Sequence, residues 1–252
     1  MKVIGIHGRA CSPAHNPAAV AVENGEILFA IEEERLVRYK YSYGLFPMNA
    51  VNECLTFCNW DISDIDFWAV GWDYLMGETP EAKKEITAKV FPKILLDLIP
   101  LEKIILVNHH VAHLMSSYIL TPQKSAAGLI IDGNGENISV SIFDIENEQY
   151  SLISGVNIKD SPGLYYEAVA EYCGLGYMAS GKLMGLASYG KPFDERIYRI
   201  DGCLREAQEV QNFPVSRMEN LEVYPEWQEI LEGVAYPYQN SVHDEKAMAY
   251  IN

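Results

Sequence analysis

Three of the six histidines in this chain fall within five residues, at positions 109, 110 and 113. The apolar run 104–107 just before them is typical of a buried strand. On a helix, His109 and His113 would lie one turn apart on the same face. Two neutral imidazoles at that spacing can bind one cation and leave positions for a carboxylate, water or substrate. The spacing indicates a candidate metal site, although histidines packed or capped at a helix start would show the same pattern.

Two glycine-containing segments could contact phosphate. Gly133 and Gly135 follow a predicted strand and would let the backbone approach a ligand, as in phosphate-binding turns, but the same residues are also common in hairpin turns. Gly181 and Lys182 carry a similar ambiguity. Lys182 could contact a phosphate, whereas composition by itself indicates only a helix bounded by glycines.

The composition is that of a globular protein with an acidic surplus. Hydrophobic residues make up 49% and charged residues 21% of the 252, which excludes wholesale disorder. The formal net charge is -16, so nucleic acid and anionic membranes should be repelled and are disfavoured as partners. No apolar stretch approaches the roughly 18 to 20 residues of a membrane span. Five scattered cysteines without a CxxC pair or secretory signal favour a cytoplasmic location.

The predicted elements form two similar rounds. Each round opens with three strands joined by hairpins: 2–6, 18–22 and 27–31, then 126–131, 138–143 and 150–156. Alternating helices and strands separate the two groups, and the histidine helix closes the first round. This repetition suggests an internal duplication of α/β class. It is the element order expected of the actin-like ATPase (ASKHA) fold, in which two related lobes enclose a nucleotide.

The predicted lobes divide the chain into three parts. Residues 1–122 form a first lobe, residues 123–192 begin a second lobe, and residues 193–252 form an irregular acidic segment ending in a short predicted helix. A helix that short is marginal by itself. We therefore expect an incomplete second lobe with exposed apolar surface, unless residues 224–238 fold back and cover it.

Five motifs stand in order along the chain: 15–19, 32–40, 109–113, 132–136 and 180–190. Together they resemble the NodU/CmcH family of O-carbamoyltransferases, which carbamoylate hydroxyl groups of antibiotics and nodulation factors. The resemblance extends from Lys2 to about Pro192. It implies that the chain holds the N-terminal part of the family's actin-like carbamoyltransferase domain.

The resemblance implies a metal site made by His109, His113 and Asp132. Two imidazoles and one carboxylate suit Fe(II), Zn or Mn, and the sequence does not choose among them. His110 lies between the two histidine ligands in the sequence and would point elsewhere, as a packing residue or a neighbour of the ligands.

The resemblance also implies two catalytic residues, His15 and Lys40. His15 matches a family histidine and would be the base that activates the acceptor hydroxyl, because imidazole titrates near working pH. Asn16 stands where the family has an aspartate, which leaves the strength of this base open. Lys40 matches a lysine that contacts the carbamoyl or phosphate group. Alternatively, Lys40 and the arginines before it form a solvated strand end paired with residues 32–34.

The implied chemistry has two half-reactions. Carbamoyl phosphate and ATP give a carbamoyl-adenylate, and the carbamoyl group then passes to a hydroxyl of a small-molecule acceptor. The family makes the adenylate in a YrdC-like domain and consumes it in the actin-like domain, where Gly181 and Lys182 would lie on the nucleotide side. The chain resembles only the first portion of the actin-like domain. Either a second chain supplies the YrdC-like domain, or this chain is truncated and inactive.

Two other functions fit the sequence. A relative of the tRNA threonylcarbamoyl transferases would share the fold and the two-histidine site, but the net charge of -16 opposes tRNA binding. A non-catalytic accessory protein would bind metal or nucleotide without turnover. Release of AMP from supplied carbamoyl-adenylate distinguishes these functions.

Overall fold

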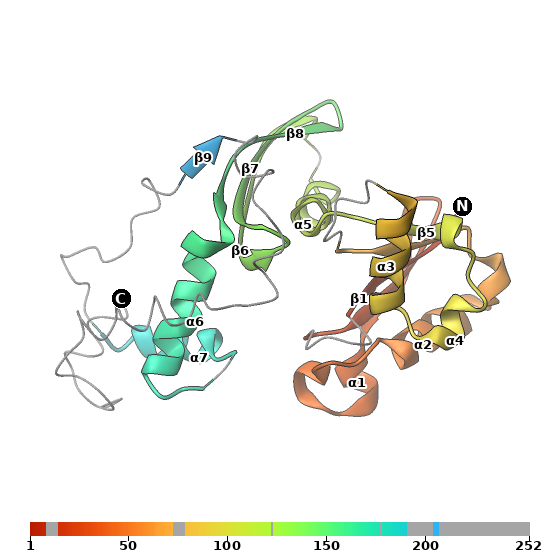
Figure 1. Ribbon diagram of the computed structural model, residues 1–252, viewed down its shortest axis with the longest axis horizontal. Helices are drawn as coiled ribbons and strands as arrows, with labels where there is room; N and C mark the ends of the chain where they lie inside the picture. The colour runs from red at the N-terminus through yellow and green to blue at the C-terminus, as the bar shows by residue number, and fades with distance from the viewer. Residues whose placement is uncertain (9–14, 73–78, 122, 177, 191–203, 207–252) are drawn as a thin grey trace. The chain divides into compact units, whose positions relative to one another are not determined.

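The computed structural model describes all residues except 9–14, 73–78, 122, 177, 191–203 and 207–252. The chain divides into two compact units, Met1–Ala112 and His113–Asn252, whose boundary falls inside one helix (Figure 1). The boundary that the sequence predicts lies later, after residue 122. The predicted acidic segment 193–252 lies outside the described residues, apart from 204–206.

The first unit is built on a five-stranded sheet in the order β3-β2-β1-β4-β5. Its strands are β1 (Lys2–His7), β2 (Ala18–Glu23), β3 (Glu26–Glu32), β4 (Phe67–Val70) and β5 (Ile104–Leu106). The first three pair antiparallel, whereas β4 is parallel to β1 and β5 is parallel to β4. The parallel strands β1, β4 and β5 therefore end at the same edge of the sheet.

In the described part of this unit, α-helices that connect and cover the strands are α1 (Glu33–Val37), α2 (Met48–Cys58), α3 (Pro80–Val90) and α4 (Lys93–Leu96). The sequence predicts one helical region over 80–99, and the structure has two helices there. Pro92 explains the break, because proline has no backbone N–H to donate and disfavours helical geometry in the residue before it.

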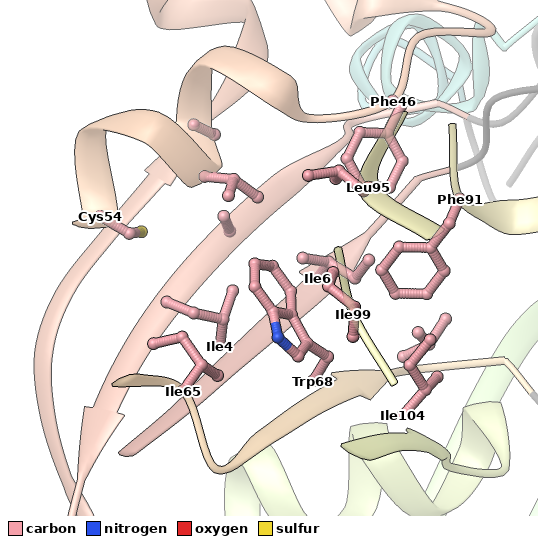
Figure 2. Packing of buried hydrophobic residues seen from close by; sticks show 14 of the residues in the cluster. Ile4, Ile6, Phe46, Cys54, Ile65, Trp68, Phe91, Leu95, Ile99 and Ile104 are labelled. Atoms are coloured by element: carbon pink, nitrogen blue, oxygen red, sulfur yellow. The ribbon is translucent and has the colours of Figure 1, made fainter. Parts of the chain in front are cut away.

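Trp68 on β4 lies at the centre of the core of the first unit. Its side chain is fully buried, as are those of Ile4, Ile65 and Ile104 (Figure 2). The ring of Phe91 packs edge-on against Trp68, with 6.5 Å between centroids. Burying each of these large apolar side chains contributes about 1.5 to 3 kcal/mol. This core holds the strand ends of the parallel edge in place.

The second unit contains a sheet in the order β6-β7-β8-β9 with antiparallel pairing throughout. Its strands are β6 (Ser125–Gly135), β7 (Ile138–Glu146), β8 (Gln149–Asn157) and β9 (Leu204–Glu206). Helix α5 (His109–Tyr118) spans the boundary between the units, and α6 (Pro162–Tyr172) and α7 (Ser180–Ala187) follow β8. The predicted histidine helix is thus confirmed as α5.

Strand β6 is longer than the sequence predicts. It continues through Asp132 to Gly135, with a shift of register between Ile131 and Gly135. The turn comes afterwards, at Glu136, whose φ is 53°. Because Gly135 still pairs with Ile138 across the hairpin, the residues expected to form a turn are part of the strand.

Both units open with three antiparallel strands in sequence, β1–β3 and β6–β8. In the first unit, helices and two parallel strands follow, which is the order expected of an actin-like lobe. The predicted α/β, actin-like fold class is confirmed. Within the described part of the chain, no helix has the length and apolar character needed to cross a membrane.

Candidate functional site

The parallel edge of the first unit gathers aromatic and histidine side chains. His7 is the last residue of β1, Gly71 and Trp72 follow β4, and His109 begins α5 shortly after β5. The ring centroid of His7 lies 6.2 Å from that of His109 and 6.2 Å from that of Trp72. Ligand sites commonly occur at such carboxyl ends of parallel strands.

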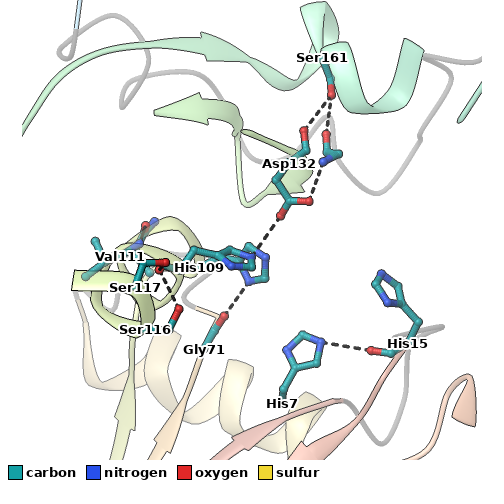
Figure 3. A network of polar contacts seen from close by, with 12 residues as sticks. His7, His15, Gly71, His109, Val111, Ser116, Ser117, Asp132 and Ser161 are labelled. Carbon is teal, nitrogen blue, oxygen red and sulfur yellow. Dashed lines mark hydrogen bonds and ion pairs between the residues drawn. The ribbon is translucent and has the colours of Figure 1, made fainter. Parts of the chain in front are cut away.

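His109 is held by two contacts within the first unit. Its Nδ1 lies 3.0 Å from the carbonyl oxygen of Gly71 (Figure 3). Because a carbonyl only accepts, Nδ1 carries a proton, and in the neutral ring the lone pair is then on Nε2. The ring also stacks on Trp72, with centroids 3.8 Å apart and planes 21° apart. His109 is therefore held in the tautomer that offers Nε2 as a ligand.

His113 and Asp132 form an ion pair within the second unit. The Nε2 atom of His113 lies 3.6 Å from Oδ2 of Asp132, while Oδ1 of Asp132 accepts a 2.6 Å hydrogen bond from the backbone N–H of Gly133. Interaction with the Asp132 carboxylate raises the pKa of His113, and partial burial opposes the rise. Without a metal, the nearby carboxylate favours the protonated form of the imidazole.

The ligand atoms of His109, His113 and Asp132 all lie within 4.8 Å of one another. The two histidines come from one face of α5, and the carboxylate comes from the end of β6. Two neutral imidazoles and a carboxylate are a suitable donor set for Fe(II), Zn or Mn. In the described part of the chain, no other group of three or more histidines, cysteines or carboxylates meets this distance. His110, between the two histidines, is fully buried.

The segments of His15 and Lys40 lie side by side in the first unit. The backbone N–H of Asn16 donates a 2.8 Å hydrogen bond to the carbonyl of Tyr41. His15 also reaches the parallel edge, because its carbonyl accepts from Nε2 of His7 at 3.2 Å (Figure 3). The ammonium of Lys40 is exposed and lies 4.8 Å from the ring centroid of Tyr41. The segment of His15 thus adjoins the short 3-10 helix Lys40–Ser42, which begins with the second predicted catalytic residue.

The acidic run before Lys40 is only partly a solvated strand end. Arg35 pairs with Glu32 at 3.3 Å and with Glu34 at 3.7 Å, which fits that alternative. Glu33, in contrast, is 1% exposed, and its carboxylate accepts from the backbone N–H of Ala50 at 2.8 Å and from the Asn49 amide at 2.6 Å. Glu33 therefore caps the start of α2.

Gly133 and Gly135 are placed by other parts of the second unit. Gly135 pairs with Ile138 in the hairpin. A Cβ built on Gly163 of α6 would lie 2.7 Å from the Cα of Gly133 and from the carbonyl oxygen of Asp132. At this point it is α6 that packs closely against the backbone of β6.

Gly181 and Lys182 lie exposed in the first turn of α7. The carboxylate of Glu167, on α6, accepts hydrogen bonds from the backbone N–H groups of Ala179 at 3.2 Å and Ser180 at 3.1 Å. These two amides already hold an anionic group. A phosphate near α7 would have to use the Lys182 side chain instead.

Sequence reasoning missed His7 and Trp72. Both are neighbours of a predicted ligand only because β1, β4 and β5 end at one sheet edge. The available signal was the position of each residue directly after or at the end of a predicted strand. To use this signal, one would need to know which strands are neighbours in the sheet, and the order of elements along the chain does not tell this.

In sequence, the chain matches one family model and is similar to several known proteins. A sequence model described as "Carbamoyltransferase N-terminus" matches residues 82–223, more than half of the chain. The nodulation protein NolNO of Sinorhizobium fredii is 30% identical over 197 residues, which are 72% of this chain and 29% of that protein. An uncharacterized protein of Methanocaldococcus jannaschii, MJ1051, is 29% identical over 79% of this chain and 36% of its own length. The chain spans about a third of the length of these curated relatives.

Among solved structures, component A of the (R)-2-hydroxyglutaryl-CoA dehydratase of Acidaminococcus fermentans is similar over 100% of this chain and 85% of its own. The identity is 12% and the TM-score 0.43. YeaZ from Pseudomonas aeruginosa is similar over 60% of this chain and 63% of its own, at 11% identity and a TM-score of 0.34.

Proposed function

This chain belongs to the family of the carbamoyltransferase N-terminus, and we propose on that premise that it contributes the site where a carbamoyl group passes to a hydroxyl. The donor we propose is carbamoyl-adenylate, and the acceptor is a small molecule. The observation that carries the proposal is the triad of His109, His113 and Asp132, with ligand atoms within 4.8 Å of one another in a member of this family.

We assign a divalent metal, Fe(II), Zn or Mn, to this triad. The tautomer of His109 set by Gly71 supports the assignment, as does the orientation of the Asp132 carboxylate toward His113. When bound, such a metal polarises a carbonyl or binds phosphate oxygens. The stacked Trp72 keeps the His109 ring from rotating, so this ligand loses little conformational freedom on binding.

His15 would accept the proton of the acceptor hydroxyl. The acceptor oxygen then forms a bond with the carbamoyl carbon, and the bond from that carbon to the phosphate oxygen breaks. AMP leaves with the electron pair of that bond. Imidazole suits this role because it is largely neutral at working pH. The hydrogen bond between Asn16 and Tyr41 keeps the base beside the Lys40 loop, and Lys40 would contact a carbamoyl or phosphate oxygen as a point charge.

Nucleotide contacts would come from the second unit. Lys182 is exposed on the first turn of α7, and Gly133 and Gly135 follow the proposed ligand Asp132 on its strand. Synthesis of the adenylate from ATP and carbamoyl phosphate would fall to a YrdC-like domain in further sequence or on a second chain. We therefore expect this chain to use preformed adenylate.

The test supplies carbamoyl-adenylate, one divalent metal and a panel of hydroxyl-bearing sugars, and measures AMP release and the mass of the product. We expect a carbamoylated product, with the rate lowered at least 100-fold by His15→Gln, the scale of lost general base catalysis. Lys93→Met, at an exposed lysine elsewhere in the first unit, is the control and should leave the rate unchanged. Binding of the adenylate without AMP release would instead support an accessory role.

A further inference from the structure

Asp132 is the candidate ligand that depends most on the local backbone. It lies near the end of β6, where the register shifts, and its Oδ1 accepts from the N–H of the next residue, Gly133, at 2.6 Å. Its Oδ2 faces Nε2 of His113 at 3.6 Å. A rotation of the peptide between Asp132 and Gly133 would therefore turn the carboxylate away from the histidine.

Ser161 holds that stretch of backbone from the start of α6. Its side chain is fully buried, and its hydroxyl lies 2.7 Å from the carbonyl oxygen of Gly133 and 3.4 Å from that of Asp132 (Figure 3). A hydroxyl has one proton, so the shorter contact is the donated hydrogen bond. The same oxygen accepts from the N–H of Leu164 at 3.0 Å, as the N-cap of α6.

Gly163 allows α6 to come this close. A Cβ at this position would lie 2.7 Å from the carbonyl oxygen of Asp132 and 2.7 Å from the nitrogen and Cα of Gly133. These are backbone atoms of β6, which cannot move aside as the end of a flexible side chain can. Any larger residue at 163 would push apart the start of α6 and the end of β6.

We propose that Ser161 and Gly163 are positioning residues for the metal ligand Asp132. The hydroxyl of Ser161 fixes the carbonyl of Gly133, and the missing side chain of Gly163 lets this contact form. Neither residue contacts the metal. The inference rests on the proposed metal site and adds the elements that set the direction of its carboxylate. Substituting a residue that orients a metal ligand without contacting the metal commonly lowers metal affinity by about 10- to 100-fold.

The experiment measures binding of Co(II) alone to the purified chain, by titration calorimetry and by the visible ligand-field spectrum. Ser161→Gly removes the hydroxyl but keeps a residue that is tolerated at an N-cap, so α6 should lose little stability. Ser161→Ala removes both the hydroxyl and the cap. We expect both variants to lose about 10- to 100-fold in Co(II) affinity to the same extent, whereas only the alanine variant should melt clearly earlier.

If Ser161 acted only as the N-cap of α6, the alanine variant would bind Co(II) more weakly and the glycine variant would bind it nearly as tightly as the wild type. Gly163→Ala should repeat the affinity loss by displacing α6. Two matched controls should bind Co(II) like the wild type. Ser139→Ala removes a buried hydroxyl that contacts carbonyls of β8, and Gly185→Ala adds a methyl group in α7 where nothing lies within 4 Å.

The outcomes separate the two levels of the proposal. If wild-type protein binds Co(II) and Ser161→Gly binds it equally tightly with an unchanged spectrum, the positioning role is overturned and the metal site stands. If wild-type protein and the His113→Ala variant both fail to bind Co(II), the metal site itself is overturned, and the positioning role with it.

Discussion

Glu33 shows how one buried carboxylate can organise a loop that carries candidate catalytic residues. It accepts hydrogen bonds from the first turn of α2, at Asn49 and Ala50, while its neighbours Glu32 and Glu34 pair with Arg35. These hydrogen bonds tie Glu33, at the start of α1, to the first turn of α2.

Replacing Glu33 by alanine should lower the free energy of unfolding by about 2 to 3 kcal/mol, because it leaves buried donors of α2 without an acceptor. Denaturant unfolding followed by circular dichroism measures this. Glu32→Gln, at a largely exposed ion pair, is the matched control and should stay within about 0.5 kcal/mol of the wild type. Equal effects of the two substitutions would show that Glu33 does not cap α2.

The ion pair of His113 and Asp132 predicts a pH dependence in the metal-free protein. Asp132 raises the pKa of His113 above its unfolded value, so the pair stabilises the protein fully below about pH 6.5, the unfolded value. This contribution disappears as pH rises through the folded pKa. Asp132→Asn should lower the pKa of His113, as followed by NMR of the ring protons. An unchanged pKa in this variant would refute the pair.

At the scale of elements, α5 packs on β6 through a glycine. A Cβ at Gly128 would overlap the Leu114 side chain and would lie 3.4 Å from the Cβ of Phe143. Leu114 is 3% exposed, so its side chain has little room to move. The glycine therefore sets how closely the histidine helix approaches the strand that carries Asp132.

Gly128→Ala should cost about 1 to 3 kcal/mol by overpacking and should weaken Co(II) binding, since α5 must move away from β6. Because the conflict is with one side chain, the cost should be smaller in a Leu114→Ala background, as a double-mutant cycle on unfolding measures. Strictly additive costs in that cycle would mean that Gly128 and Leu114 do not meet.

The sequence predicted most elements from local patterns. Apolar runs located β1 to β3, β5 and β6 to β8. The predicted hairpin between β2 and β3 contains Gly25, which has a φ of 88°. The spacing of His109 and His113 predicted one face of α5. These features depend on residues that are close in the sequence, which is why local reasoning found them.

The parts that the sequence did not predict depend on distant contacts. The alternative of a solvated strand end over residues 32–34 is wrong for Glu33, because its partners on α2 lie 16 and 17 residues away in the sequence. Glu167 likewise contacts residues that are 12 and 13 positions away in the sequence, where its carboxylate caps α7. The approach of a ligand at Gly133 and Gly135 stays a prediction, whereas Gly163, where a Cβ would lie 2.7 Å from backbone atoms of β6, was not singled out from the sequence.

At the scale of the whole molecule, one face of the second sheet presents apolar side chains to solvent. Leu129 and Ile131 alternate along β6 and are 61% and 60% exposed. Gly128 and Ile130, which alternate with them, face the opposite side of the sheet, where Leu114 packs near Gly128. An apolar sheet face of this kind binds hydrophobic probes or other protein surfaces.

Binding of an environment-sensitive hydrophobic dye tests this face. We expect the purified chain to enhance dye fluorescence and the double variant Leu129→Ser with Ile131→Ser to reduce the enhancement at least twofold. Ile27→Ser, at an exposed apolar residue in the first unit, should leave it nearly unchanged. Equal enhancement in all three proteins would show that this face is covered in solution.

The central claim is that α5 and the end of β6 form one metal site. It is tested most directly by measuring metal content and Co(II) affinity of the wild type and of the His109→Ala, His113→Ala double variant. Asp144→Asn, at an exposed carboxylate on β7, is the matched control. We predict one bound ion per chain in the wild type and the control, and affinity lowered by more than 100-fold in the double variant, since each lost ligand should cost at least as much as a lost ligand neighbour. Equal metal content and affinity in all three proteins would contradict the account.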